Sequence, residues 1–208
     1  MAGRRVVDRF DGRILGVGSR SGVRLVIGDW RRSPLGSFTD VMVATADERR
    51  LLLAPSDEVA DYVTRTYTFD EVVRCPVTLT ETRTKGGRRW LVEAGPVAAR
   101  IEVGARTATG WMLAPIPGPL ARSRALATLV DPVARIVHPG VRTRGSAGGG
   151  RREYYGARDQ HVVTEIDGTW RGEDLGALAE MRPAPEFGFS STPSRPSLTR
   201  VTTTVVQV

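Results

Sequence analysis

Short apolar runs that alternate with turn signals are the feature that most constrains the fold of this chain. The runs "GRILGVG" and "GVRLVIGDW" flank the Gly/Ser turn "SRSG", which is typical of a β-hairpin. The alternating stretch "SFTDVMVAT" follows, and "RRLLLAP" comes after the polar turn "ADE". This spacing predicts an antiparallel meander in the N-terminal quarter of the chain.

The hydrophobic period changes from two to that of a helix after Ser56, which is a favourable N-cap residue. Asp57 and Glu58 add negative charge to the first turn, where the helix dipole favours it. The apolar and aromatic residues that follow keep a helical spacing: Val59, Tyr62, Val63 and Tyr67. We expect a helix that ends near Thr66 or Tyr67.

The rest of the chain predicts more strands and one further helix. "VVRCPVTLTETR" and "RRWLVEAG" flank "TKGG", a hairpin signal that places Lys85 at the tip, and "VAARIEVGA" adds a third strand. Residues 118–137 have helical spacing with a kink or restart at Pro132. "REYYGARDQHVVTEIDGTW" predicts a long strand closed by an Asp-Gly turn, and "LTRVTTTVVQV" a last strand. Together these segments predict one α+β domain over residues 1–208, mostly antiparallel β with two or three helices, and a flexible loop at 142–152.

The charge of the chain is basic, but its origin is ambiguous. The formal net charge of +7 favours contact with phosphates, so nucleic acid or another polyanion is one candidate partner, through Arg142, Arg144, Arg151 and Arg152. However, Lys85 is the only lysine among 30 basic residues. Such an arginine excess is also what codon bias in a GC-rich genome produces, and the arginines are scattered along the whole chain.

Other features bear on where the protein acts and in what state. No apolar run approaches the ~20 residues that a membrane span needs, and the N-terminus has no secretory signal. The single cysteine, Cys75, excludes an intrachain disulfide and a cysteine-based zinc site. We therefore expect a cytoplasmic protein without a membrane partner. The last strand could pair with a second copy if it lies at a sheet edge, which would give a homo-oligomer.

Several familiar chemical motifs are missing. The stretch Gly145–Gly150 lacks the Gly-Lys-Ser/Thr ending and the following helix of a phosphate-binding loop. The histidines His138 and His161 have no metal-ligand spacing, and His161 falls within a predicted strand. No Gly-x-Ser-x-Gly elbow is present. We expect no metal and no cofactor.

Asp40 is the leading candidate for a functional residue. It lies in the alternating strand "SFTDVMV", and its neighbours on the same strand face, Phe38 and Met42, are apolar. A charge on an apolar face is costly unless it is paired or faces a cavity. The alternatives are a half-solvated sheet face and a carboxylate that binds a nearby arginine.

The stretch "LGSFTDVMV" resembles the Gly-x-Tyr-Thr-Glu strand of the acetoacetate decarboxylase-like superfamily. Gly36, Phe38, Thr39 and Asp40 stand where that family has glycine, an aromatic residue, threonine and a glutamate of the catalytic site. The order of strand, helix, bend and hairpin is also similar, as is the late segment "YYGARDQHVVTEIDGTWRG". In addition, "RTRGSAGGGR" and "STPSRPS" resemble stretches of uncharacterised actinobacterial proteins, which imply no function.

The chain departs from this family at the residue that forms the Schiff base. The family places a lysine with a depressed pKa in the bend between the helix and the next strand. Here the bend, "TRTYTFDEVVR", contains no lysine. Arginine cannot replace it because the guanidinium stays protonated. Decarboxylation through a Schiff base is therefore not expected.

The resemblance still implies a curved, barrel-like sheet around a central cavity. We expect such a cavity to bind a small, partly apolar molecule whose polar group is an anion or a carbonyl. The predicted lining residues are Trp30, Phe38, Tyr67 and Arg74, together with Asp40. Arg74 could bind a ligand carboxylate or simply neutralise Asp40. The alternative is a lyase or isomerase that acts on a carbonyl compound, with Asp40 as the catalytic general acid or base.

Overall fold

The computed structural model describes residues 6–117, 120, 123, 142–147, 150–188, 190 and 192–207. Within these ranges the chain forms two helices, α1 (Asp57–Thr64) and α2 (Ala108–Leu113). It also forms thirteen strands: β1 (Val7–Ser19), β2 (Arg24–Arg32), β3 (Phe38–Ala44), β4 (Arg50–Ala54), β5 (Glu71–Arg74), β6 (Val77–Thr84), β7 (Gly87–Ala94), β8 (Val97–Arg106), β9 (Arg144–Ala147), β10 (Arg151–Trp170), β11 (Glu173–Asp174), β12 (Leu178–Ala179) and β13 (Ser197–Gln207).

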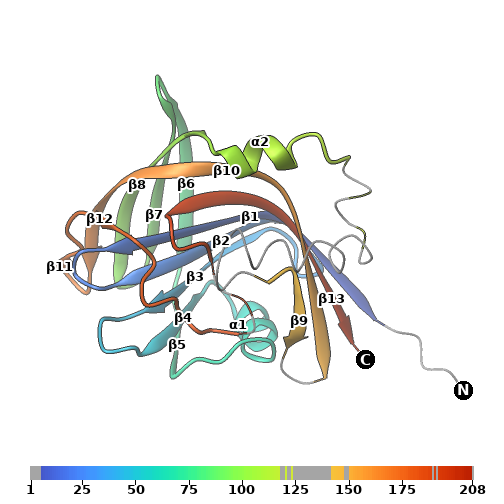
Figure 1. Cartoon of the computed structure of the whole chain (residues 1–208). Helices are drawn as coiled ribbons and strands as arrows, with labels where there is room; N and C mark the ends of the chain where they lie inside the picture. Colours follow the sequence, from blue (N-terminus) through green and yellow to red (C-terminus); the bar gives the residue numbers. More distant parts are fainter. Residues whose placement is uncertain are drawn as a thin grey trace, which may run out of the picture.

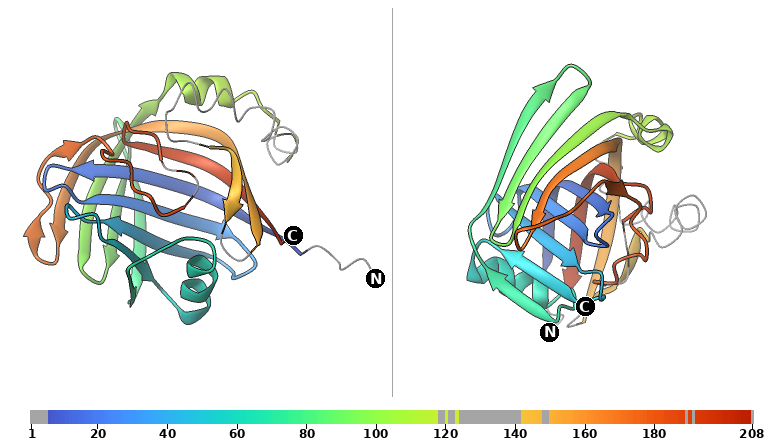
Figure 2. Two further views of the ribbon diagram at one scale, coloured as in Figure 1. Left: turned by 60° about the horizontal axis from the view of Figure 1, so that its bottom comes forward. Right: turned by 90° about the vertical axis from the view of Figure 1, so that its left-hand side faces the viewer.

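All the strands belong to one sheet that curls into an open half-barrel (Figures 1 and 2). Its main path runs β5-β4-β3-β2-β1-β13-β10-β8-β7-β6, while the short strands β9 and β11 pair with β10 and β12 pairs with β1. The pairs are antiparallel except β4 with β5, which is parallel because α1 connects them. The predicted α+β class and curved antiparallel sheet are confirmed.

The strands β1 to β3 are covered on both faces. One face packs in the apolar core, and the other borders a cavity. Ile27 and Val41 belong to an apolar core that also contains Trp90 of β7, so the first half of the sheet packs on the second half across this core. Their sequence neighbours Val26 and Met42 point to the other side, because side chains alternate along a strand, and they line a cavity. One face is therefore solid, and the opposite face is hollowed.

Helix α1 begins where the sequence predicts. The Ser56 side chain accepts a hydrogen bond from the Val59 backbone N–H at 3.3 Å, which caps the first turn. Its buried residues Val59 and Val63 pack on Leu52 of β4. The helix ends at Thr64, slightly before the predicted end.

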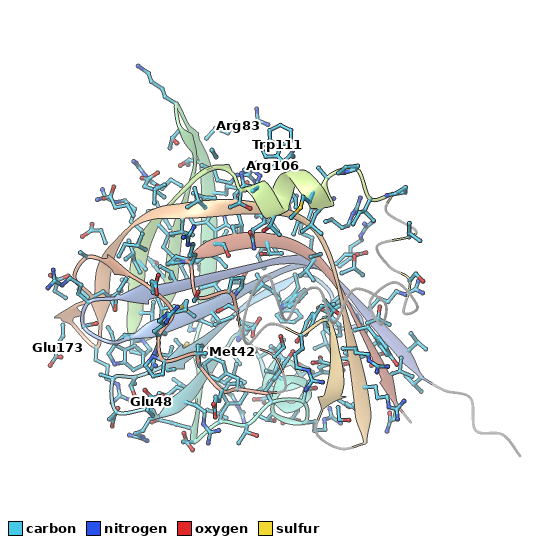
Figure 3. All side chains as sticks on the ribbon, viewed as in Figure 1. Met42, Glu48, Arg83, Arg106, Trp111 and Glu173 are labelled. Atoms are coloured by element: carbon cyan, nitrogen blue, oxygen red, sulfur yellow. The ribbon has the colours of Figure 1, made fainter. Side chains whose placement is uncertain are left out.

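Helix α2 was not predicted. Its N-cap is Thr107, whose side chain accepts a hydrogen bond from the Gly110 backbone N–H at 3.0 Å. The two helices lie beside different strands of the curled sheet, α1 beside β4 at the bottom of Figure 1 and α2 beside β10 at its top. The outer side of α2 presents Trp111, whose ring stacks with the Arg106 guanidinium (Figure 3). The predicted helix at 118–137 lies almost entirely outside the described residues, as does His138.

Three details differ from the sequence-based prediction. The segment predicted as one strand before "TKGG" is divided into β5 and β6 at Cys75–Pro76, because proline has no N–H to donate to a ladder. Strand β10 continues through Asp167–Gly168, and the chain turns instead at Arg171 and Gly172, which have positive φ. Strand β13 lies between β1 and β10 in the middle of the sheet, so it offers no free edge to a second copy.

Other expectations hold at the level of the backbone. The turn of the β6–β7 hairpin contains Lys85, and the hairpin extends well beyond the rest of the sheet, with Arg83 near its tip (Figure 3). Neither helix in the described part of the chain has the length and apolar character needed to cross a bilayer.

The difference between the two faces of β2 gives a test of the fold. We expect Ile27→Ala to lower the free energy of unfolding by about 2–5 kcal/mol, because it opens a new void in a close-packed core. Val26→Ala should cost clearly less, since Val26 already borders an open volume. Urea unfolding of both variants measures the difference, and equal losses would contradict the assignment of the faces.

Candidate functional site

The hollowed face of the sheet borders a cavity of about 460 Å³. Its floor comes from β1, β2, β3, β13 and the first half of β10. Its walls come from α1, α2 and five residues near the C-terminal strand: Pro185, Phe187, Ser190, Thr192 and Pro193. Most of the lining is apolar, with Phe10, Ile14, Met42, Leu113 and Phe187 as examples. This size and character are typical of a site for a small organic molecule.

Asp40 lies in the floor of this cavity and is only 2% exposed. The indole Nε1–H of Trp30 donates a hydrogen bond to its Oδ1 at 3.0 Å. Asp40 pairs in register with Gly28 on β2, and a Cβ at Gly28 would collide with both the carboxyl oxygen and the indole nitrogen. The missing side chain at position 28 therefore makes the room in which Asp40 and Trp30 meet.

No cation of the described chain pairs with Asp40. The half-buried carboxylates Asp29 and Asp159, in contrast, bind Arg13 at 2.6 Å and Arg106 at 2.9 Å. Burial without a counter-charge raises the pKa of Asp40 to about 7, although the hydrogen bond from Trp30 opposes this shift. Near neutral pH the group is therefore distributed between its acid and its carboxylate form.

Glu153 is a second buried acid in the cavity wall, also 2% exposed. It accepts hydrogen bonds from the hydroxyl groups of Tyr67 at 3.1 Å and Tyr155 at 3.2 Å, and these hydroxyl groups lie 2.6 Å apart. Burial raises the pKa of Glu153 to about 7, while both tyrosines and the more distant charge of Arg151 lower it. Burial and the nearby carboxylate also raise the pKa of both tyrosines well above the usual value. This cluster joins the end of α1 to β10.

Tyr62 continues the wall along α1. Its hydroxyl donates to Asp8 Oδ2 at 2.9 Å, and the guanidinium of Arg151 stacks on its ring at 4.7 Å. Arg151 also donates to Thr66 Oγ1 at 3.0 Å. These contacts fix the last turn of α1 over the cavity.

Three polar atoms in the cavity lining are buried without a hydrogen-bond partner among the described residues. They are the Nε of Arg142 and the Oγ1 atoms of Thr192 and Thr203. Buried polar groups normally find a partner in the protein or in water. A bound molecule or water in the cavity could supply these bonds.

The structure brings four of the five predicted site residues to the cavity lining: Trp30, Phe38, Asp40 and Tyr67. Arg74 is the exception. It points away from Val73, which packs on the apolar core, and it pairs with Asp57 on the exposed surface. Arg74 is not part of the lining and does not neutralise Asp40, so both roles considered for it are corrected.

Sequence reasoning missed Glu153 and Tyr155 as members of the site. In "REYYG" these two residues stand two apart, so they share one face of a strand, and an acid beside an aromatic residue on such a face was the available signal. Their approach to Tyr67 depends on the packing of α1, which no local pattern encodes.

Two of the four arginines considered for polyanion binding are engaged with the cavity side of the molecule. Arg142 lines the cavity and Arg151 stacks on Tyr62. Arg152 is exposed on β10, and Arg144 on β9 is exposed with a partner of its own. Two of the four arginines are therefore engaged in contacts at the cavity, and two are exposed.

Other candidate chemistry is not found at the cavity. Lys85 lies in the turn of the β6–β7 hairpin and is not among the lining residues. Burial raises the pKa of the Cys75 thiol, which disfavours the thiolate. His161 contacts the Gly104 carbonyl at 3.1 Å and Asp159 at 3.4 Å. Within the described ranges, no three His, Cys, Asp or Glu side chains are grouped as metal ligands would be.

Comparison with known proteins gives no family for this chain. No protein-family model matches it, and no curated protein matches it significantly in sequence.

The shifted pKa of Asp40 predicts how stability depends on pH. The folded protein holds this proton up to about pH 7, whereas the unfolded chain loses it near 3.8, so the stabilisation is complete below about pH 4 and is lost as the pH rises through 7. Asp40→Asn cannot ionise. Its stability relative to the wild type should therefore rise by on the order of 4 kcal/mol between about pH 4 and about pH 9, as measured by urea unfolding.

Asp70 provides the matched control for this measurement. Hydrogen bonds from Arg50 lower the pKa of Asp70, so its stabilisation is present at neutral pH and is lost as the pH falls through its folded pKa. Asp70→Asn should thus become less stable relative to the wild type as the pH rises, the opposite trend. A constant difference between Asp40→Asn and the wild type would contradict the burial of an unpaired acid.

Proposed function

We propose that this protein binds a small, mostly apolar molecule in the cavity between α1, α2 and the sheet. The observation that supports this most directly is Asp40, a buried acid with no cationic partner in the described chain, in the floor of an apolar cavity of about 460 Å³. A solid core would not tolerate such a group without a partner. A ligand that bonds to it would remove the cost.

Polar groups elsewhere on the wall favour a ligand that is not purely a hydrocarbon. Among the described residues, Arg142 Nε has no acceptor, and the hydroxyl oxygen of Thr203, which is 3% exposed, has no hydrogen-bond partner. An anionic or carbonyl oxygen of the ligand would satisfy these groups, in the role first considered for Arg74. A polyanion is less well supported, because Arg142 and Arg151 are directed to the cavity and to Tyr62.

The resemblance to the acetoacetate decarboxylase-like superfamily remains a proposal about ancestry. The order of strands and helix is compatible with it, but the site has no lysine among its lining residues. We therefore propose a binding site of that general kind without Schiff-base chemistry. We also propose a cytoplasmic location, on the basis of the single cysteine.

Filling the cavity should abolish binding. We expect Val26→Trp to remove most of the binding of a neutral probe, phenylbutanone, because the indole would occupy the volume beside β2. Isothermal titration calorimetry measures the loss. Leu91→Trp on the exposed face of β7 is the control for adding an indole, and it should bind like the wild type. Equal binding by Val26→Trp, once circular dichroism shows that it is folded, would refute the cavity as the binding site.

A second candidate is an enzyme that moves a proton next to a carbonyl group, with Asp40 as the general acid or base. The pKa of Asp40, about 7, favours this because a group that titrates near the working pH can both accept and donate a proton. Tyr67 and Tyr155 are poor bases here, since burial keeps them protonated.

Proton exchange at carbon tests this candidate. In deuterated water the wild type should accelerate exchange of the protons next to the carbonyl of phenylbutanone, as followed by NMR. Asp40→Asn should lose about 10²-fold or more of this acceleration, while Glu153→Gln should keep it, because Glu153 is held by its two tyrosines. Exchange no faster than in buffer would leave the protein as a binder only.

A further inference from the structure

We propose that the ligand has a basic nitrogen, and that Asp40 binds this nitrogen as a cation. This inference rests on the proposed binding function and adds the charge of the ligand at one defined position. The nitrogen would take the place of the arginine that pairs with other partly buried acids of this protein.

The first support is the distribution of ion pairs. The chain has 30 basic residues, and Asp29 and Asp159 both bind arginine although they are only half buried. Asp40 is more deeply buried, and its one side-chain hydrogen bond in the described chain comes from the neutral Trp30. The charge of its carboxylate form is therefore left for a molecule outside the described chain to balance.

The second support is the aromatic wall beside Asp40. Phe10 packs edge-on against Trp30 at 5.7 Å and against Phe38 at 6.4 Å, and it contacts Tyr62 at 5.0 Å. All four rings line the cavity. Aromatic faces attract ammonium groups, most strongly where water is excluded. A carboxylate surrounded by such rings suits an amine with an apolar body.

None of the other ionisable groups described in the cavity lining supplies a positive charge to Asp40. Both tyrosine hydroxyls lie within hydrogen-bond distance of Glu153, so this acid already has polar partners in the protein. Arg142 also lines the cavity, but it forms no ion pair with Asp40 in the described chain. Tyr62, Tyr67 and Tyr155 stay neutral because their pKa values are raised.

The sign of the pH dependence separates a cationic ligand from a neutral one. A cation needs the carboxylate form of Asp40, so its affinity should rise by about tenfold between about pH 6 and about pH 8.5, for a group that titrates near 7. A neutral carbonyl needs the protonated form as its donor, and its affinity at this position should fall by about thirtyfold over the same range. A primary amine stays protonated throughout.

The experiment compares phenylbutylamine with phenylbutanone by calorimetry on the full-length protein at these two pH values. We expect the affinity of the wild type for the amine to increase with pH, and Asp40→Asn to lose about tenfold or more of that affinity together with the pH dependence. Glu153→Gln tests the other buried acid of the same cavity. Asp70→Asn, which removes an acid that does not line the cavity, is the control, and it should retain both the affinity and its pH dependence.

The outcomes distinguish this inference from the function on which it rests. If the ketone binds in the cavity but the amine does not, or if the affinity for the amine is unchanged in Asp40→Asn, the inference is wrong and the binding function stands. If neither probe binds and Val26→Trp does not differ from the wild type, both are refuted. If Glu153→Gln loses the affinity for the amine and Asp40→Asn does not, the cation binds at Glu153 and the inference is wrong.

Discussion

The alternation of side chains in β1 to β3 is the constraint on which the site depends. One set of residues, such as Ile27 and Val41, closes the core against the second half of the sheet. Because successive side chains of a strand point to opposite faces, the residues between these core residues must point to the other face. That face is covered by α1, α2 and residues such as Phe187 and Pro193, and a cavity remains between them and the sheet. The cavity is thus a consequence of a sheet that is covered on both sides.

The two buried acids in this cavity solve the same desolvation problem in different ways. Glu153 has two phenol donors, and the pair of tyrosines connects it to the end of α1. Asp40 has one indole donor and no ion pair in the described chain. Burial raises the pKa of both groups to about 7. Glu153 thus has two polar side-chain partners, whereas Asp40 has one, so similar pKa values arise in different surroundings.

The sequence predicted the elements whose signals are local. Alternation and turn residues identify β1 to β4, and the Ser56 cap identifies α1, because each depends on neighbours in the chain. Asp40 could be found for the same reason, as a charge within an apolar strand face. The place of β13 between β1 and β10 could not, because it depends on partners far away in sequence. The prediction for Arg74 was wrong because Val73 packs on the core side of the edge strand β5, which directs Arg74 to the opposite side. No residue pattern nearby encodes that packing.

Gly28 indicates that the contact between Asp40 and Trp30 is built into the sheet. A glycine within a strand weakens it, because it adds conformational freedom to the unfolded chain and no side chain to the packing. Here the position opposite Asp40 in the register has no Cβ, and any Cβ there would collide with both partners of the hydrogen bond. An apolar residue at position 40 would remove the cost of burying an acid. The strand would then no longer need a glycine at position 28 to make room for the carboxyl group. The proposed binding site would explain why a weakened strand, an acid without an ion pair in the described chain and an open volume occur together here.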